Sequence, residues 1–166
     1  DVGIYPLTWA LIAVEPSNTQ STKPLKVIAA QSHSSGVEVT TSAILGCPST
    51  GFQASISSTF AAVPVSDVVC RIQGSKGYID VIGKDASHPA SFTVYGQISQ
   101  GQFEESNYDF THPGQGFFYE ADNTGSDILA GRTESAIMPW AETIRVLEIM
   151  DEIRRQGGTV YIQDKE

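Results

Sequence analysis

The period of the hydrophobic positions changes along the chain and separates it into three regions. Apolar residues are nearly continuous over residues 2–14, a pattern that predicts a buried helix. The polar segment EPSNTQSTKP (residues 15–24) is rich in turn formers, and a series of strand-like segments follows it. Helical patterns return only after residue 116. We therefore expect one helix, a run of strands and then further helices.

The clearest strand is predicted for GFQASISSTF, residues 51–60, where the pattern has a period of two residues. The two alternating sets are Phe52, Ala54, Ile56, Ser58 and Phe60 against Gln53, Ser55, Ser57 and Thr59. One face of this strand is therefore mainly apolar, and the other is rich in hydroxyl groups. The hydroxyl-rich face either meets solvent or provides a surface for a ligand or a partner subunit.

Five other segments have the composition of strands: residues 25–30, 37–45, 68–73, 78–82 and 91–98. GSKG at residues 74–77 predicts a tight turn between two of them. The connections are too short to contain crossover helices, so we expect neighbouring strands to run antiparallel.

Two helices are predicted after the strands. The first spans residues 117–129, and we expect NTGSD (residues 123–127) to shorten it, because a glycine inside a helix costs about 1 kcal/mol relative to alanine. The second has Pro139 at its first position and ends at Gly157 and Gly158. It carries an apolar stripe at helical spacing, formed by Trp140, Ile144, Leu147, Met150 and Ile153.

This order of elements predicts an α+β fold, in which an open, mostly antiparallel sheet has helices packed on one face. The 166 residues are enough for one domain with a sizeable core, because chains of about 150 residues bury roughly 70% of their extended surface. We therefore expect residues 1–166 to form a single domain.

Charge and composition exclude several classes of partner. The net charge is −9, and nucleic-acid binding depends on Lys and Arg, so no nucleic acid is expected as a partner. The apolar run at residues 2–14 is shorter than the roughly 20 residues that cross a bilayer, so no membrane association is expected. Cys47 and Cys70 lack the spacing of a metal site and are interpreted as reduced thiols, which favours a cytoplasmic location.

The sequence lacks the common catalytic and cofactor motifs. It has no Gly-x-Ser-x-Gly segment, which would indicate a hydrolase nucleophile. Gly114-Gln-Gly116 begins like a dinucleotide-binding loop, but Tyr119 stands in the place of the third glycine. The three histidines, His33, His88 and His112, are scattered through loop contexts, so no metal site is predicted.

The opening segment holds the strongest candidate chemistry. Asp1 and Tyr5 are four residues apart, so on a helix they lie one turn apart on the same face. A phenol can take or give a proton when a nearby cation favours its ionised form. The alternative interpretation is structural, with a carboxylate at the positive end of a helix dipole and a tyrosine at the margin of the core.

Four segments read together resemble one protein family: DVGIYPLTWAL, RIQGSKGYIDV, GFFYEAD and ESAIMPWAETIRVLEIMDEIRRQGG. In this order they resemble the C-terminal half of the glucose-fructose oxidoreductase/inositol dehydrogenase (Gfo/Idh/MocA) family. Within it, the similarity is strongest to the branch of dimeric dihydrodiol dehydrogenases and fungal NADP-dependent D-xylose dehydrogenases. The resemblance covers nearly the whole chain.

The resemblance implies an enzyme with an N-terminal Rossmann domain that is missing from this chain, since neither a Gly-rich loop nor a Glu-Lys-Pro motif is present. It implies that Tyr5 is the catalytic acid/base and that Asp1 binds substrate, with Phe118 and Tyr119 as candidates for the pocket lining. The expected cofactor is NADP, bound mainly by the missing domain, and the expected substrate is a sugar or a cyclic diol.

The same resemblance implies that the chain is a substrate-binding and oligomerisation domain, inactive when isolated. It is expected to form a homo-oligomer through the open face of the sheet. The alternative is a non-catalytic binding or assembly module derived from the same family.

Overall fold

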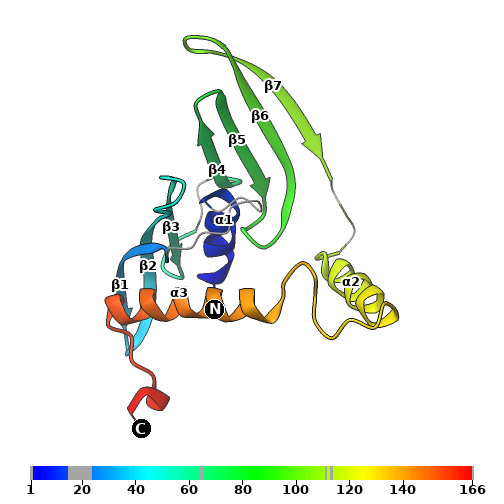
Figure 1. Cartoon of the computed structure of the whole chain (residues 1–166). Helices are drawn as coiled ribbons and strands as arrows, with labels where there is room; N and C mark the ends of the chain where they lie inside the picture. The colour runs from blue at the N-terminus through cyan, green and yellow to red at the C-terminus, as the bar shows by residue number, and fades with distance from the viewer. Residues whose placement is uncertain (1, 15–23, 64–65, 111, 113, 166) are drawn as a thin grey trace. The chain divides into compact units, whose positions relative to one another are not determined.

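The computed structural model describes residues 2–14, 24–63, 66–110, 112 and 114–165. The chain consists of two compact units: Asp1–Val63 with Ala141–Glu166, and Pro64–Trp140. The helices and strands follow the predicted order along the chain (Figure 1).

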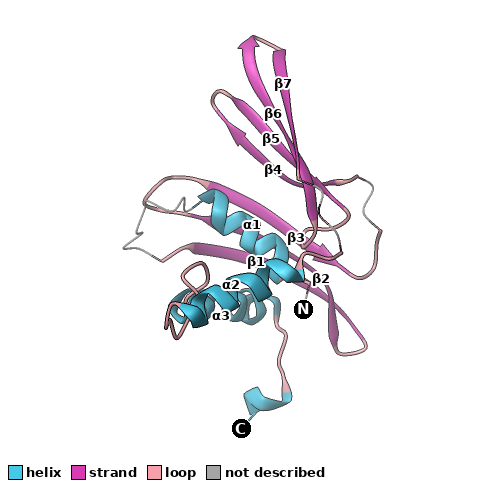
Figure 2. Ribbon diagram, turned by 90° about the vertical axis from the view of Figure 1, so that its right-hand side faces the viewer, coloured by secondary structure: helices cyan, strands magenta, loops and turns pink. Residues whose placement is uncertain are grey.

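The first unit combines a three-stranded antiparallel sheet with two helices. Its strands are β1 (Lys26–Ser34), β2 (Val37–Gly46) and β3 (Gln53–Thr59), in the order β1-β2-β3. Its helices are α1 (Ile4–Val14) and α3 (Trp140–Gly157), followed by the short 3₁₀ helix η1 (Ile162–Lys165). Helix α1 contacts β3, and Figure 2 shows the two elements beside each other.

The core of the first unit forms where both helices meet one face of this sheet. Leu7, Ala10 and Leu11 come from α1, Leu45 from β2 and Val146 from α3, and all five are buried. The burial of α1 recurs at Leu7, Ala10, Leu11 and Val14, which is the spacing of one helical face. The predicted packing of helices on one face of an antiparallel sheet is therefore confirmed in this unit.

The period-two pattern of β3 is also confirmed. Ala54, Ile56 and Ser58 are half-buried on the helix side, whereas the residues between them are exposed. On the exposed side, the hydroxyls of Thr40 and Thr59 lie 2.8 Å apart across β2 and β3. The hydroxyl-rich face is therefore the outer face of the sheet.

Helix α3 protects the free edge of β1 through one side chain. Gln156 accepts a hydrogen bond from the backbone N–H of Ala29 (2.8 Å) and donates one to the carbonyl of Val27 (2.9 Å). The amide thus pairs with β1 as a neighbouring strand would, and it satisfies backbone groups that an edge strand otherwise leaves open.

The second unit contains a four-stranded antiparallel sheet and α2 (Phe117–Leu129). Its strands are β4 (Val68–Gly74), β5 (Gly77–Gly83), β6 (Pro89–Ser99) and β7 (Gln102–Asp109), each paired with the next along the chain. The predicted turn at residues 74–77 joins β4 to β5, where Gly74 pairs with Gly77. A Cβ on Gly77 would lie 1.9 Å from the carbonyl oxygen of Tyr95, so only glycine fits there.

One face of the four-stranded sheet carries an ion pair between an exposed arginine and a buried aspartate, flanked by aromatic rings. Arg71 binds the carboxylate of Asp80 through two nitrogens, at 2.5 and 2.6 Å, and Asp80 is only 5% exposed. The guanidinium lies over the ring of Tyr78 (4.9 Å), which stacks on Tyr95 (4.3 Å between centroids). Phe103 meets Tyr78 edge-on. The ion pair thus combines two charge-assisted hydrogen bonds with a contact between the guanidinium and an aromatic ring.

The structure differs from the sequence prediction in four respects. The strands form two sheets rather than one, and β7 is a strand that the pattern did not predict, because all eight of its residues are exposed. NTGSD does not shorten α2, which runs to Leu129 because Asp127 pairs with Arg132 (2.6 Å) and secures its last turn. On α3, the buried residues are Val146 and Ile153, so only the end of the predicted stripe is buried.

Candidate functional site

Tyr5 lies in the first turn of α1, on the side opposite to the core. The buried positions of this helix are Leu7, Ala10, Leu11 and Val14. Tyr5, Thr8 and Ile12 form the opposite stripe, and Tyr5 and Ile12 are 42% and 57% exposed. Because the core face fixes the helix, the phenol is held at a defined place on the surface of the first unit. There it is accessible to solvent.

Asp1 lies outside the residues that the structure describes. Its expected place one turn before Tyr5 therefore stays a prediction.

Phe118 and Tyr119 lie together in the first turn of α2, which belongs to the second unit. Their ring centroids are 4.1 Å apart, and both rings meet His112 in edge contacts (5.9 and 5.4 Å). Phe118 is 39% and Tyr119 is 55% exposed, so neither is a core residue. The two aromatic rings that were predicted to line the pocket are therefore accessible, and both contact the imidazole of His112.

Gly116 makes this arrangement possible at the start of α2. Its φ of 83° is left-handed, and a Cβ there would lie 3.2 Å from Cε1 of His112. A larger residue would strain the backbone and push the imidazole away from the helix. The glycine that resembled part of a dinucleotide loop therefore has a local structural role.

His88, from the turn before β6, completes this cluster. Its ring stacks on His112 with a centroid distance of 5.0 Å and an interplanar angle of 25°. Nδ1 of His88 is buried and has no hydrogen-bond partner within the described part of the chain. The scattered positions of these histidines in the sequence do not predict this contact, because they are 24 residues apart and only the pairing of β6 with β7 brings them together.

Across the residues that the structure describes, no group of three or more His, Cys, Asp or Glu side chains could hold a metal ion. The described helices include none that is long and apolar enough to span a membrane. Cys47 is buried, Cys70 is half-buried, and both are free thiols.

Comparison with known proteins relates this chain to two dehydrogenases. It is 31% identical over 176 residues to D-xylose 1-dehydrogenase (NADP(+)) from Hypocrea jecorina, a match that covers 97% of this chain and 44% of that protein. It is 31% identical over 170 residues to trans-1,2-dihydrobenzene-1,2-diol dehydrogenase from Xenopus tropicalis, with coverages of 97% and 47%. The Bos taurus form of the second enzyme is 28% identical over 169 residues, with coverages of 99% and 48%.

The chain spans about half the length of these curated relatives. It corresponds to their C-terminal part. No protein-family model matches the sequence.

Proposed function

We propose that this chain belongs to the family of D-xylose 1-dehydrogenase (NADP(+)) and trans-1,2-dihydrobenzene-1,2-diol dehydrogenase and forms its C-terminal part. On this premise, it is the substrate-binding and oligomerisation domain of an NADP-dependent oxidoreductase. The reaction is the oxidation of a CH–OH group in a sugar or a cyclic diol. The observation that carries this proposal is the match to the two enzymes over 97% of the chain.

The proposal assigns the cofactor to another part of the full-length protein. This chain has no glycine-rich loop between a strand and a helix, and its net charge of −9 does not favour a phosphate-rich ligand. We therefore assign NADP to an N-terminal Rossmann domain, which would also supply a catalytic lysine. Bound there, NADP would supply the hydride acceptor for the oxidation of the substrate alcohol.

In this proposal, Tyr5 is the acid/base that receives or relays the proton of the substrate hydroxyl. Oxidation of the alcohol breaks its O–H bond, and the phenolic oxygen of Tyr5 receives or relays that proton as the carbonyl forms. The exposure of Tyr5 on a helix whose other face is anchored in the core supports this role. Asp1, Phe118 and Tyr119 are proposed to bind the substrate, the aromatic pair by contact with its carbon skeleton.

We propose that the outer face of the three-stranded sheet joins two copies of the chain. Ile28 and Ile44 are paired across β1 and β2 on this face and are 67% and 48% exposed. Apolar side chains among hydroxyls are typical of a surface that is covered in an assembly. A monomeric mass by light scattering would count against this part of the proposal.

The free thiols support a cytoplasmic location.

The test compares the full-length protein with the isolated 166-residue chain. The full-length protein should reduce NADP with at least one member of a panel of aldoses and cyclic diols, and the isolated chain should neither bind NADP nor turn over. Strong NADP binding by the isolated chain would refute the assignment of the cofactor site. A full-length protein that lacks the Gly-rich loop and reduces no NADP would instead support the non-catalytic module.

A further inference from the structure

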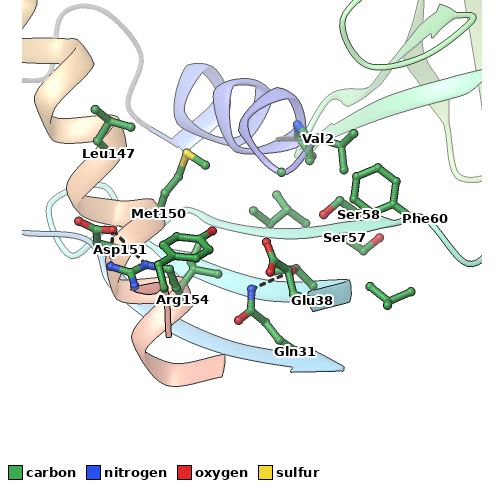
Figure 3. A pocket seen from close by; sticks show the side chains of 17 residues that line it. Val2, Gln31, Glu38, Ser57, Ser58, Phe60, Leu147, Met150, Asp151 and Arg154 are labelled. Atoms are coloured by element: carbon green, nitrogen blue, oxygen red, sulfur yellow. Dashed lines mark hydrogen bonds and ion pairs between the residues drawn. The ribbon is translucent and has the colours of Figure 1, made fainter. Parts of the chain in front are cut away.

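A cavity of about 220 Å³ lies within the first unit, on the core side of α1 (Figure 3). Its walls come from the start of α1, the inner face of the sheet, the second half of α3 and Tyr161. Pro6 lines it, whereas the neighbouring Tyr5 points to the other side of the helix and does not. The volume is below the 300–1,000 Å³ typical of drug-sized ligands, so the cavity suits a small solute.

A β-bulge turns Glu38 into this cavity. Gln31 pairs with Thr41 and Ser32 with Thr40, but His33 then pairs with Glu38, so the register skips Val39. Without this shift, Glu38 would share the outer face with Thr40, because side chains alternate along a strand. The bulge instead places Glu38 on the inner face with Gln31, and Figure 3 shows its side chain directed into the cavity. Bulges commonly re-aim side chains next to functional sites.

Glu38 is half-buried, and its carboxylate has no partner among the residues that the structure describes. Within the described part of the chain it makes no hydrogen bond and no ion pair. Its cross-strand neighbour His33 directs Nε2 to the hydroxyl of Thr159 (2.8 Å), and that hydroxyl donates to Gln31 (2.7 Å). An unpaired carboxylate that is partly removed from water is a costly feature unless a ligand compensates it.

The cation in the cavity wall is already neutralised. Arg154 forms ion pairs with Asp151 (3.1 Å) and with Asp164, and its guanidinium lies over the ring of Tyr161 at 4.8 Å from the centroid. Asp151 and Asp164 therefore neutralise this guanidinium, whereas Glu38, which also lines the cavity, has no ion pair within the described part of the chain. The local charge disfavours phosphates and carboxylates as ligands and favours a cation.

Hydroxyl groups and apolar side chains complete the wall. Thr41 accepts a hydrogen bond from Gln31 (2.9 Å), which leaves its own proton available to a ligand. Ser58 has no hydrogen-bond partner in the described structure. Ile56 and Met150 supply apolar surface. These groups fit a ligand with a charged nitrogen, hydroxyl groups and a short carbon body.

We propose that this cavity binds a small organic ammonium that also carries hydroxyl groups, such as an amino sugar or an amino alcohol, through an ion pair with Glu38. The hydroxyls of Thr41 and Ser58 bind the hydroxyl groups of the ligand, and the apolar wall contacts its carbon atoms. The site lies behind the helix turn that carries Tyr5, and it does not depend on the dehydrogenase function proposed above.

Glucosamine and glucose test the proposal, because the two sugars differ in one ammonium group. Binding of each to the 166-residue chain is measured by calorimetry at neutral pH and low salt. Glucosamine should bind about 10- to 100-fold more tightly than glucose, the range expected for a hydrogen bond to a charged group. Equal affinities, or tighter binding of glucose, would overturn the proposal and indicate a site for neutral polyols.

Substitutions then locate the site. Glu38→Gln keeps the size of the side chain and should remove the preference for glucosamine, and Ser58→Ala should weaken both sugars by a few-fold. Glu148→Gln, an exposed residue of α3 outside the cavity, is the matched control and should change neither affinity. Thermal unfolding establishes that each variant is folded. A glucosamine preference that survives in folded Glu38→Gln would refute the assignment.

Discussion

Two neighbouring residues of β2 test the assignment of the inner and outer faces of the first unit. Leu45 is fully buried between α1, α3 and the sheet, whereas Ile44 points the other way and is 48% exposed. Replacing each by alanine removes the same number of carbon atoms. The two substitutions should therefore differ in cost only through their surroundings.

The expected losses follow from burial. Leu45→Ala removes three buried carbon groups, worth about 2.4 kcal/mol at about 0.8 kcal/mol each. The cavity left among Leu7, Leu11 and Val146 adds to this, so the total should lie within about 2–5 kcal/mol. Ile44→Ala removes groups that are about half in water, and its cost should be about 1 kcal/mol.

Urea unfolding followed by tryptophan fluorescence measures the difference, at a protein concentration low enough to dissociate the proposed oligomer. For a slope of about 2 kcal/mol per molar, Leu45→Ala should lower the midpoint by about 1–2.5 M and Ile44→Ala by about 0.5 M. Similar losses for the two variants, or a larger loss for Ile44→Ala, would refute the assignment of faces.

Two further predictions concern α3. Hydrogen bonds from Arg155 and Gln156 lower the pKa of Glu152 from 4.5 to about 2, so their stabilisation should be complete above pH 4.5 and disappear as the pH falls through about 2. The stability difference between the wild type and Glu152→Gln, measured by urea unfolding from pH 7 to pH 2, should shrink over that window, and a constant difference would contradict the reasoning. Gly157→Ala should lower the free energy of unfolding by about 1–3 kcal/mol, because a Cβ would lie 2.1 Å from Oε1 of Gln31. Gly125→Ala, where a Cβ meets nothing within 4 Å, should instead stabilise by about 0.5–1 kcal/mol, and equal effects of the two alanines would contradict the packing of α3 on Gln31.

The helices and six strands could be predicted from the sequence because each has a period that burial imposes. The alternation at residues 51–60 identified β3 and its two faces, and the spacing of apolar residues identified α1. Strand β7 was not predicted, because its residues are exposed on both faces and burial therefore imposes no period on them. Its place depends on pairing with β6. A period of two also does not tell which strands pair, so the division into two sheets could not be predicted.

The candidate site was predictable only in part. Tyr5, Phe118 and Tyr119 were identified by resemblance, and the structure leaves all three accessible. The stacking of His88 on His112 depends on the return of the chain through β6 and β7, and the inward turn of Glu38 depends on a single bulge. Neither feature leaves a signal in composition or period, because each arises from strand register.

The central proposal is that Tyr5 moves the substrate proton in a dehydrogenase of which this chain is the C-terminal part. The most direct measurement is the rate of NADP reduction by the full-length protein and by its Tyr5→Phe variant, with the substrate that the screen identifies. The proposal predicts that kcat falls about 10²- to 10⁴-fold, the usual contribution of general acid–base catalysis, while KM changes little. An unchanged kcat in the folded variant would contradict it.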